Sequence, residues 1–267
     1  GEPSTDPDRW GRLYRLSYDS ASQQYSLDDG FPVTVNEGRS ETLTLAKDST
    51  GQLWVTYVMT TTKGITPTVE VSPTYRVMVN HSIKSETVTD TLQGDDDWGE
   101  PFVLPVPAGQ EAAVEVARDD ISAVIAFDGY IGVMWSNQNT DSFYFAVHAD
   151  GAPEDEWQVV SVYSGPNASE DHINLKSLQV DSAGNVFAVV KTKSSDRVIL
   201  LSCTSGDCAS VSNWNASRVY RSSEGDPSRP ILLIDTEEQT LYVFVALPEG
   251  GGAIYYKTSP ISSILFP

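Results

Sequence analysis

Cysteine and histidine are scarce in this chain: two cysteines and three histidines occur among 267 residues. No set of Cys and His with the spacing of a zinc site is present. The two cysteines, Cys203 and Cys208, flank a Gly/Asp turn between two strand-like segments. This spacing predicts a small disulfide and an oxidising compartment. The alternative, half of a metal site, lacks a second Cys/His pair nearby.

Basic residues are also few. Lys and Arg total 17 against 37 Asp and Glu, which gives a formal charge of −20. Such a charge repels nucleic acid and anionic membranes, and leaves cations and neutral molecules as ligands. No run of ~18 apolar residues exists, so no membrane span is expected. The chain opens on Gly1 rather than Met and has no signal peptide, so we expect a processed, secreted or cell-surface protein.

Several functional patterns are missing. The chain has no convincing helix, no Gly-rich phosphate loop and no Ser/His/Asp arrangement for nucleophilic catalysis. No Asp-x-Asp-x-Asp-Gly calcium loop occurs either. We therefore expect no cofactor, although the abundance of acidic loops leaves Ca²⁺ open.

A repeated β-hairpin dominates what is present. Each copy is an apolar strand, a tight turn that contains an aspartate, and a second apolar strand. The turn aspartates are Asp48, Asp128, Asp181 and Asp235. Third strands are expected at 75–79, 143–147, 198–202 and 253–257. Outer strands begin at Trp98, Trp157 and Trp214.

Four antiparallel strands per ~50-residue repeat are the signature of a β-propeller, so we predict an all-β propeller with four-stranded blades. A single domain over 1–267 is expected, with a β-sandwich as the fallback. Its parts are a frayed N-terminus at 1–9, a half blade at 10–36, blades at 39–106, 119–164 and 171–220, and a last blade at 226–267. These make about 4.5 blades. Either the partial blades combine to give five, or an N-terminal portion or a second chain completes a ring of six or seven.

Several segments are similar to those of uncharacterised, exported bacterial proteins of sialidase-like (BNR/Asp-box-type) appearance. They include Tyr25-Ser26-Leu27-Asp28-Asp29-Gly30-Phe31-Pro32-Val33, Asp48-Ser49-Thr50-Gly51-Gln52-Leu53-Trp54 and Ile254-Tyr255-Tyr256-Lys257-Thr258-Ser259-Pro260. The resemblance covers nearly the whole chain and implies a sialidase-type propeller with further blades ahead of Gly1. It implies no established activity. The turn from Asp48 to Gly51 is one residue longer than the Ser-x-Asp-x-Gly-x-x-Trp motif of true sialidases.

Polar residues recur at equivalent positions ahead of the turn aspartates, where the first strand of each blade begins. Positions two apart share one strand face, so we expect these side chains to meet around the central channel. The predicted ligand-binding residues are Arg39, Glu41, Asp119, Asp120, His172, Asn174, Lys176 and Arg229. The alternative is a wet channel whose polar groups satisfy one another and ordered water.

An enzyme would need more than a pocket. A glycoside hydrolase requires a close pair of carboxylates, and the candidates are Glu41, Asp119, Asp120 and Asp171. A sialidase would use a Tyr nucleophile and three arginines, for which Tyr255 or Tyr256 and Arg39, Arg118 and Arg229 are available. Sequence gives no distances between these groups, so whether the protein is an enzyme stays open.

Together these patterns favour a secreted β-propeller that binds an extracellular ligand, with a carbohydrate as the favoured class, at the channel mouth. The first alternative is a sialidase-like glycoside hydrolase that uses the same pocket. The second is a structural or interaction module of a larger surface protein.

Overall fold

The protein is almost entirely β-structure in the computed structural model, which describes residues 2–40, 42–60, 73–85, 92–170, 178–204, 206–248 and 251–267. Within these ranges the helices are short 3₁₀ turns. They are η1 (Pro7–Arg9), η2 (Asp95–Asp97), η3 (Glu111–Ala113), η4 (Val211–Asn213) and η5 (Ser222–Glu224). No helix in the described part of the chain is long and apolar enough to cross a membrane.

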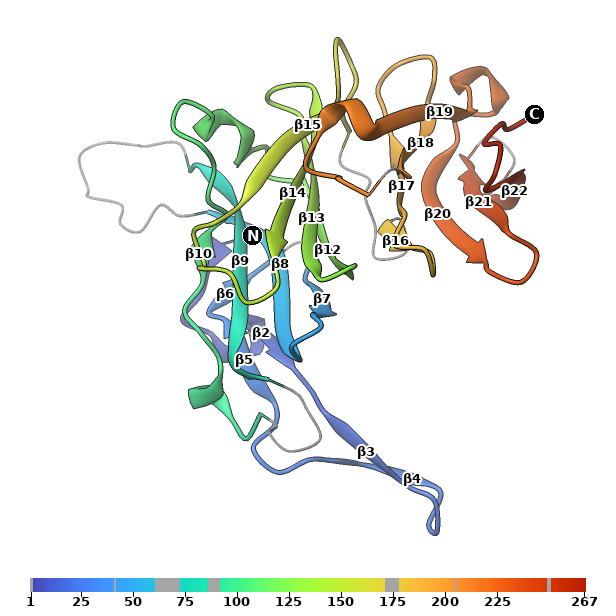
Figure 1. The fold of residues 1–267 in the computed structure, drawn as a ribbon. Coiled ribbons are helices and arrows are strands. Elements are labelled where there is room, and N and C mark those ends of the chain that lie inside the picture. The colour runs from blue at the N-terminus through green and yellow to red at the C-terminus, as the bar shows by residue number, and fades with distance from the viewer. Residues whose placement is uncertain are drawn as a thin grey trace.

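Four antiparallel sheets follow one another along the chain (Figure 1), and their strands lie in the order β7-β8-β9-β10, β12-β13-β14-β15, β16-β17-β18-β19 and β20-β21-β22. The first contains β7 (Thr44–Lys47), β8 (Gln52–Thr60), β9 (Tyr75–Ser85) and β10 (Phe102–Val103), and β11 (Glu115–Val116) also pairs with β9. The second contains β12 (Ser122–Phe127), β13 (Tyr130–Asn137), β14 (Ser142–Ala149) and β15 (Gln158–Ser164). The third contains β16 (Leu178–Val180), β17 (Val186–Lys191), β18 (Val198–Cys203) and β19 (Trp214–Tyr220). The fourth contains β20 (Ser228–Asp235), β21 (Thr240–Leu247) and β22 (Ala253–Pro260).

The first strands of the four sheets lie next to one another: β7 contacts β12, β12 contacts β16, and β16 contacts β20. Each sheet therefore runs outward from a shared line, as a propeller blade does. The four repeated hairpins predicted from sequence are all present. The described part of the fourth sheet has three strands rather than four, and β10 begins at Phe102 rather than at the predicted Trp98.

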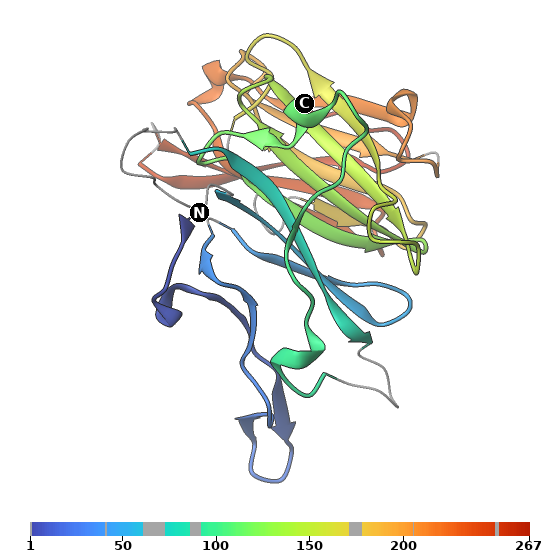
Figure 2. The same cartoon turned by 90° about the vertical axis from the view of Figure 1, so that its left-hand side faces the viewer.

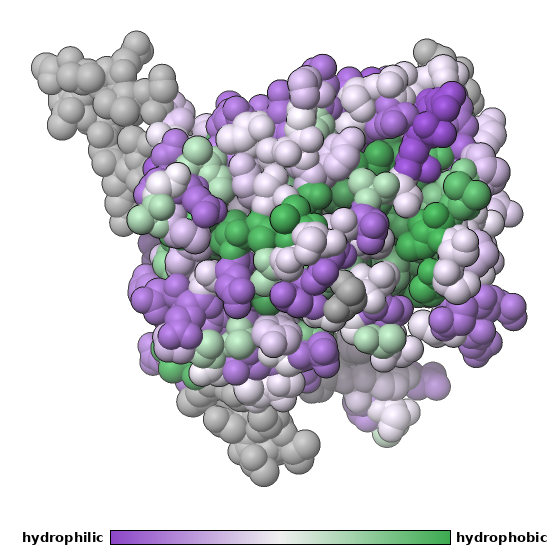
Figure 3. Space-filling view, turned by 45° about the horizontal axis from the view of Figure 1, so that its top comes forward, coloured by the Kyte–Doolittle hydropathy of each residue, from purple (hydrophilic) through white to green (hydrophobic). Residues whose placement is uncertain are grey.

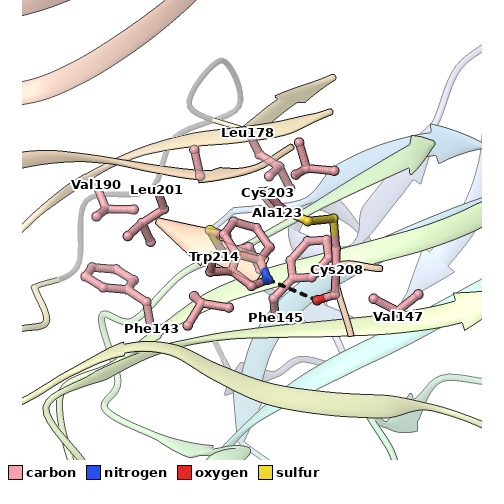
Figure 4. Packing of buried hydrophobic residues seen from close by; sticks show 14 of the residues in the cluster. Ala123, Phe143, Phe145, Val147, Leu178, Val190, Leu201, Cys203, Cys208 and Trp214 are labelled. Atoms are coloured by element: carbon pink, nitrogen blue, oxygen red, sulfur yellow. Dashed lines mark hydrogen bonds between the residues drawn. A yellow bond between two sulfur atoms is a disulfide. The ribbon is translucent and has the colours of Figure 1, made fainter. Parts of the chain in front are cut away.

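Apolar clusters fill the space between consecutive sheets. One cluster joins the first and second sheets through Trp54 and Trp135, and another joins the second and third through Phe145 and Leu201. Figure 4 shows the second of these, where the Trp214 indole donates to the Cys208 carbonyl oxygen. The predicted Cys203–Cys208 disulfide is confirmed and lies within this cluster.

The segment predicted as a half blade forms two separate two-stranded sheets: β2 (Gly11–Leu13) pairs with β5 (Val33–Asn36), while β3 (Leu16–Asp19) and β4 (Gln24–Leu27) form a hairpin. That hairpin projects from the body of the molecule (Figures 1 and 2). At the N-terminus, β1 (Glu2–Pro3) pairs with β6 (Gly38–Arg39).

The turn aspartates explain why the hairpins recur. Asp48 accepts hydrogen bonds from the backbone N–H groups of Thr50 and Gln52, and Asp181 accepts from those of Ala183 and Asn185. A carboxylate that accepts these backbone hydrogen bonds stabilises the turn, so the chain reverses direction there instead of continuing as a strand.

Candidate functional site

The sheet end at which β7, β12, β16 and β20 begin is called here the mouth end, and Asp119, Asp120 and Arg229 lie at it. Its described polar side chains bridge neighbouring sheets. Asp119 accepts from the Gln138 amide at 3.0 Å, and the Gln138 amide oxygen accepts from Lys193 at 2.6 Å. The Lys191 ammonium lies 2.8 Å from Glu170 and 3.3 Å from Ser228. These groups satisfy one another, as the wet-channel alternative requires.

Asp120 is the most deeply buried of the predicted residues, with 0% of its surface exposed. Its carboxylate accepts from the backbone N–H groups of Ala117 and Gln138 and from the Ser136 hydroxyl, at 2.7–3.0 Å. Burial raises the pKa of this carboxyl above its usual value, against the effect of those hydrogen bonds. The geometry is that of a group that holds the start of β12 in place.

The other predicted residues are dispersed or outside the described ranges. Arg39 is exposed in β6, and Arg229 is exposed at a bulge in β20 with φ of 51°. Tyr255 is 48% exposed in β22. Four more predicted ligand-binding residues and one catalytic candidate lie outside the described residues: Glu41, His172, Asn174, Lys176 and Asp171. Their roles stay predictions.

A pocket of about 670 Å³ lies beside the first sheet, between it and the N-terminal segment. We call it the Trp98 pocket. Its walls come from the N-terminal segment, β5, the ends of β8 and β9, and the segment 95–101. The lining residues are Pro3, Ser4, Thr5, Trp10, Thr34, Val35, Asn36, Glu37, Met59, Thr60, Met78, Asn80, Asp95, Trp98, Gly99, Glu100 and Pro101.

Local hydrogen bonds fix these walls. The buried Asn80 amide donates to the carbonyl oxygens of Val35 at 3.0 Å and Gly99 at 2.8 Å, and so joins β5 to the segment that follows Trp98. The Asp95 carboxylate accepts from the Thr34 backbone N–H at 2.6 Å. The pocket is therefore a consequence of how the half blade docks on the first sheet.

Two residues of the pocket lining have a buried side-chain N–H without a protein partner: Asn36 at Nδ2 and Trp98 at Nε1. Asn36 is 2% exposed, and its Oδ1 accepts from the Gly11 and Gly38 backbone N–H groups. The Tyr57 hydroxyl in the adjoining apolar cluster also lacks a protein partner. An unpaired buried donor costs about 1–3 kcal/mol, so a polar partner for the Asn36 or Trp98 side chain would stabilise the protein.

Trp98 departs from its own repeat. The other tryptophans that precede or open outer strands have satisfied indoles: Trp157 donates to the Glu154 carbonyl oxygen and Trp214 to that of Cys208, each at 2.9 Å. Of these three indole N–H groups, only that of Trp98 has no protein partner. Trp98 lines the pocket described above. The sequence shows a Trp at each of the three positions but not whether its indole N–H has a hydrogen-bond partner, so it did not predict the Trp98 pocket.

The described histidines lie together with two tryptophans between the first and second sheets. The Trp54 ring lies 4.6 Å from that of His81 and 4.9 Å from that of His148, which stacks on Trp157 at 4.9 Å. The His148 ring is buried and its Nδ1–H donates to the Glu156 carbonyl oxygen at 3.1 Å. The rings of this cluster pack against one another between the two sheets, and the His81 Nε2 lies 2.8 Å from the Glu154 carboxylate.

We expect His148 to make the protein sensitive to acid. Burial lowers the pKa of His148, and the neighbouring His81 adds to this, while the hydrogen bond to the Glu156 carbonyl and the nearby Asp150 and Asp48 raise it in part. A depressed histidine pKa stabilises the fold above the unfolded pKa of about 6.5, and that stability is lost as pH falls toward the folded pKa. The slope for one proton is at most about 1.4 kcal/mol per pH unit. The difference in free energy of unfolding between wild type and His148→Gln, measured in urea from pH 7.5 to 5, should shrink as pH falls. A constant difference would contradict this assignment.

Within the described residues no group of three or more His, Cys, Asp and Glu side chains is placed to hold a metal ion. A second pocket, of about 330 Å³, lies at the opposite end of the second sheet and includes Tyr130, Asp155 and Trp157. Its Trp157 indole is already satisfied, so the Trp98 pocket is the stronger candidate.

No protein-family model matches the chain, and no curated protein matches it significantly in sequence. Among solved structures, a protein of unknown function from Dyadobacter fermentans DSM 18053 is 12% identical, with a TM-score of 0.54 over 96% of this chain and 70% of that one. The Hadza microbial sialidase Hz136 is 13% identical, with a TM-score of 0.49 over 88% of this chain and 51% of that one. The chain thus spans about half the length of that sialidase. The catalytic domain of a Coprinopsis cinerea GH62 α-L-arabinofuranosidase is 12% identical, with a TM-score of 0.42 over 86% of this chain and 68% of that one. At these identities the likeness concerns the fold alone, and no family match supports the narrower Asp-box grouping.

Proposed function

We propose that this protein binds a neutral carbohydrate in the Trp98 pocket. The observation that supports the proposal best is the Trp98 indole N–H, which has no protein partner although its two counterparts in the repeat do. The nearby Asn36 amide presents a second donor of the same kind. A ligand with several hydrogen-bond acceptors would satisfy both.

The chemistry of the lining favours sugar hydroxyls. Three carboxylates, those of Glu37, Asp95 and Glu100, line the pocket, and its described lining has no Lys or Arg. A hydroxyl both donates and accepts, so it can bond to a carboxylate and to an N–H donor at the same site. An anionic sugar such as a sialic acid would meet three negative charges without an arginine to pair with. Neutral glycans are therefore favoured over sialylated ones.

Glycan-array screening of the full chain, followed by calorimetry on the tightest neutral hit, tests the proposal. Trp98→Phe keeps an aromatic face and removes the donor. Asn36→Asp keeps the oxygen that caps Gly11 and Gly38 and replaces the amide donor. Because a bound polar group left without its partner costs about 1–3 kcal/mol, each variant should weaken binding by a factor of about 5 to 150.

Trp214→Phe is the matched control, since it removes an indole N–H that is already satisfied in the core between the second and third sheets. Its affinity for the glycan should equal that of wild type. Equal affinities for all four proteins, or binding restricted to sialylated glycans, would contradict the proposal.

The mouth-end residues belong to a second form of the proposal, in which the ligand binds at the channel mouth. Alanine variants of the exposed residues Arg39, Asp119 and Arg229 separate the two forms, because they lie outside the Trp98 pocket lining. If the protein is a glycoside hydrolase, it will also release reducing sugar from the glycan that it binds.

We also propose that the protein is secreted, because oxidising compartments favour disulfides such as Cys203–Cys208.

The four consecutive sheets also support a propeller as the complete architecture. We propose that the ring has five blades, or that this chain is part of a ring of six or seven, because the sequence predicts about 4.5 blades and propellers close with ~4 to 8. The half blade and the three-stranded last sheet are the two ends at which such a ring would close.

A further inference from the structure

The charged side chains that line the Trp98 pocket all have the same sign. The described lining contains three carboxylates, those of Glu37, Asp95 and Glu100, and no Lys or Arg. All three residues are exposed, and none of them forms an ion pair with a basic side chain in the described part of the chain. Asp95 already accepts the Thr34 backbone N–H, so the Glu37 and Glu100 carboxylates are the two available to a ligand.

Basic residues of the neighbouring N-terminal elements bond elsewhere. The Arg9 guanidinium lies 3.4 Å from the Asp6 carboxylate, and Arg12 donates to a backbone carbonyl oxygen of η1 at 3.1 Å. Arg39 lies in β6, outside the pocket lining. The pocket therefore keeps a local excess of negative charge, in a chain whose formal charge is −20.

Glu37 and Glu100 come from two different walls of the pocket, and hydrogen bonds hold the backbone of each wall. The Glu37 carbonyl oxygen accepts from the Ser4 N–H at 3.3 Å. Glu100 follows Gly99, whose carbonyl oxygen accepts from the buried Asn80 amide at 2.8 Å. A charged group on ordered backbone loses less conformational freedom when it binds a partner. The two carboxylates are thus placed in advance for a cationic group.

Unpaired carboxylates alone do not mark a site, because hydrophilic residues are spread over the face of the molecule that Figure 3 shows. The Trp98 pocket differs in its buried donors. Asn36 and Trp98 are 2% and 6% exposed, and each has a side-chain N–H without a protein partner. These N–H groups require an acceptor, whereas the carboxylates favour a donor that carries positive charge. The two requirements point to a ligand with both hydroxyl and ammonium groups.

We propose that the Trp98 pocket prefers glycans with an unsubstituted amino sugar over the same glycans with a hydroxyl in place of the amine. This specificity rests on the proposed carbohydrate site. Neutral sugars bind there through their hydroxyls, and an ammonium group adds ion pairs with Glu37 and Glu100. For two exposed ion pairs at low salt, the dissociation constant of the amino sugar should be about three- to tenfold smaller.

The probes are the methyl glycosides of glucosamine and galactosamine, each compared with that of its parent sugar, glucose or galactose. The full chain is titrated at about pH 6, where the amines are protonated, and binding is followed through the Trp98 indole N–H signal of ¹⁵N-labelled protein. Wild type should bind at least one amino sugar about three- to tenfold more tightly than its parent in about 50 mM NaCl. That advantage should disappear in about 500 mM NaCl, since salt screens exposed charges.

Glu37→Gln and Glu100→Gln keep a hydrogen-bond acceptor and remove one charge each. Each should reduce the preference for the amino sugar and change the dissociation constant of the parent sugar by less than about twofold. Asp96→Asn is the matched control, because Asp96 is an exposed carboxylate next to Asp95 but lies outside the pocket lining. It removes the same formal charge and should keep the wild-type preference.

The outcomes separate this specificity from the carbohydrate site itself. Parent sugars that move the Trp98 signal, without tighter binding of either amino sugar, would overturn the specificity and leave the site standing. If none of the four sugars moves that signal, both proposals fail. A preference that Glu37→Gln and Glu100→Gln leave unchanged would also overturn the specificity, since the acidic surface as a whole would then attract the amine.

Discussion

Asp120→Ala should lower the free energy of unfolding by about 3–5 kcal/mol, because three hydrogen-bond donors at a fully buried site lose their acceptor and each costs about 1–3 kcal/mol. The substitution leaves the N–H groups of Ala117 and Gln138 and the Ser136 hydroxyl without their acceptor. These donors come from both sides of the start of β12, so the second sheet loses its inner anchor. Urea denaturation followed by circular dichroism measures the change.

Asp120→Asn is the comparison that identifies the cause. An amide oxygen can accept both backbone N–H groups, and the Ser136 hydroxyl can accept from the amide nitrogen instead. We expect a loss of about 1 kcal/mol or less. Equal losses for the two variants would show that the negative charge, rather than hydrogen-bond acceptance, holds this segment. A folded Asp120→Asn that loses glycan binding would instead assign Asp120 to the ligand site.

The pH dependence of these variants has a definite sign. Burial raises the folded-state pKa of Asp120 above its unfolded value of about 3.9. A raised carboxyl pKa contributes stability that is fully present below the unfolded pKa and is lost as pH rises through the folded pKa. The stability advantage of wild type over Asp120→Asn should therefore be larger in acid than at neutral pH.

Trp54→Ala should cost a similar amount, about 3–5 kcal/mol, as for other buried aromatic truncations. Trp54 is 1% exposed and packs between His81, His148 and Trp157, so it joins the first sheet to the second. Its indole also donates to the Asp48 carboxylate at 3.0 Å, and the same carboxylate caps the β7–β8 turn. Truncation thus removes packing between the first two sheets and also weakens the β7–β8 turn.

Tyr14→Ala serves as the control for Trp54→Ala, because Tyr14 is also aromatic but 56% exposed. Its free energy of unfolding should stay within about 0.5 kcal/mol of wild type. A loss below about 1 kcal/mol for Trp54→Ala would contradict the view that the aromatic cluster holds the first two sheets together.

The repeated hairpins could be predicted from sequence because their signal is local. An aspartate that caps its own turn and strands that alternate or run apolar are properties of a few adjacent residues, as at Asp48 and Asp181. The split of the half blade could not be predicted in this way. Leu16, Tyr18, Tyr25 and Leu27 have the pattern of a buried strand face, yet they are exposed, because burial depends on which sheet packs on them.

The Trp98 pocket could not be predicted from the sequence, for a related reason. Its walls come from five separate segments, and the feature that distinguishes Trp98 from Trp157 and Trp214 is the absence of a hydrogen-bond partner. The hairpin alignment named Asp119 but not Lys191 or Lys193, because these lysines stand at the end of β17 and just beyond it, outside the aligned positions. Lys193 bonds the Gln138 that also contacts Asp119, and Lys191 bonds Glu170.

The most direct test of the central claim is a titration of ¹⁵N-labelled protein with the neutral glycan, followed through the indole N–H signals of its six tryptophans. Trp98→Phe identifies one signal by its loss. The account predicts that the Trp98 signal shifts to saturation, since its N–H gains an acceptor, while those of Trp54, Trp135 and Trp214 stay in place. A glycan that binds without moving the Trp98 signal would contradict it.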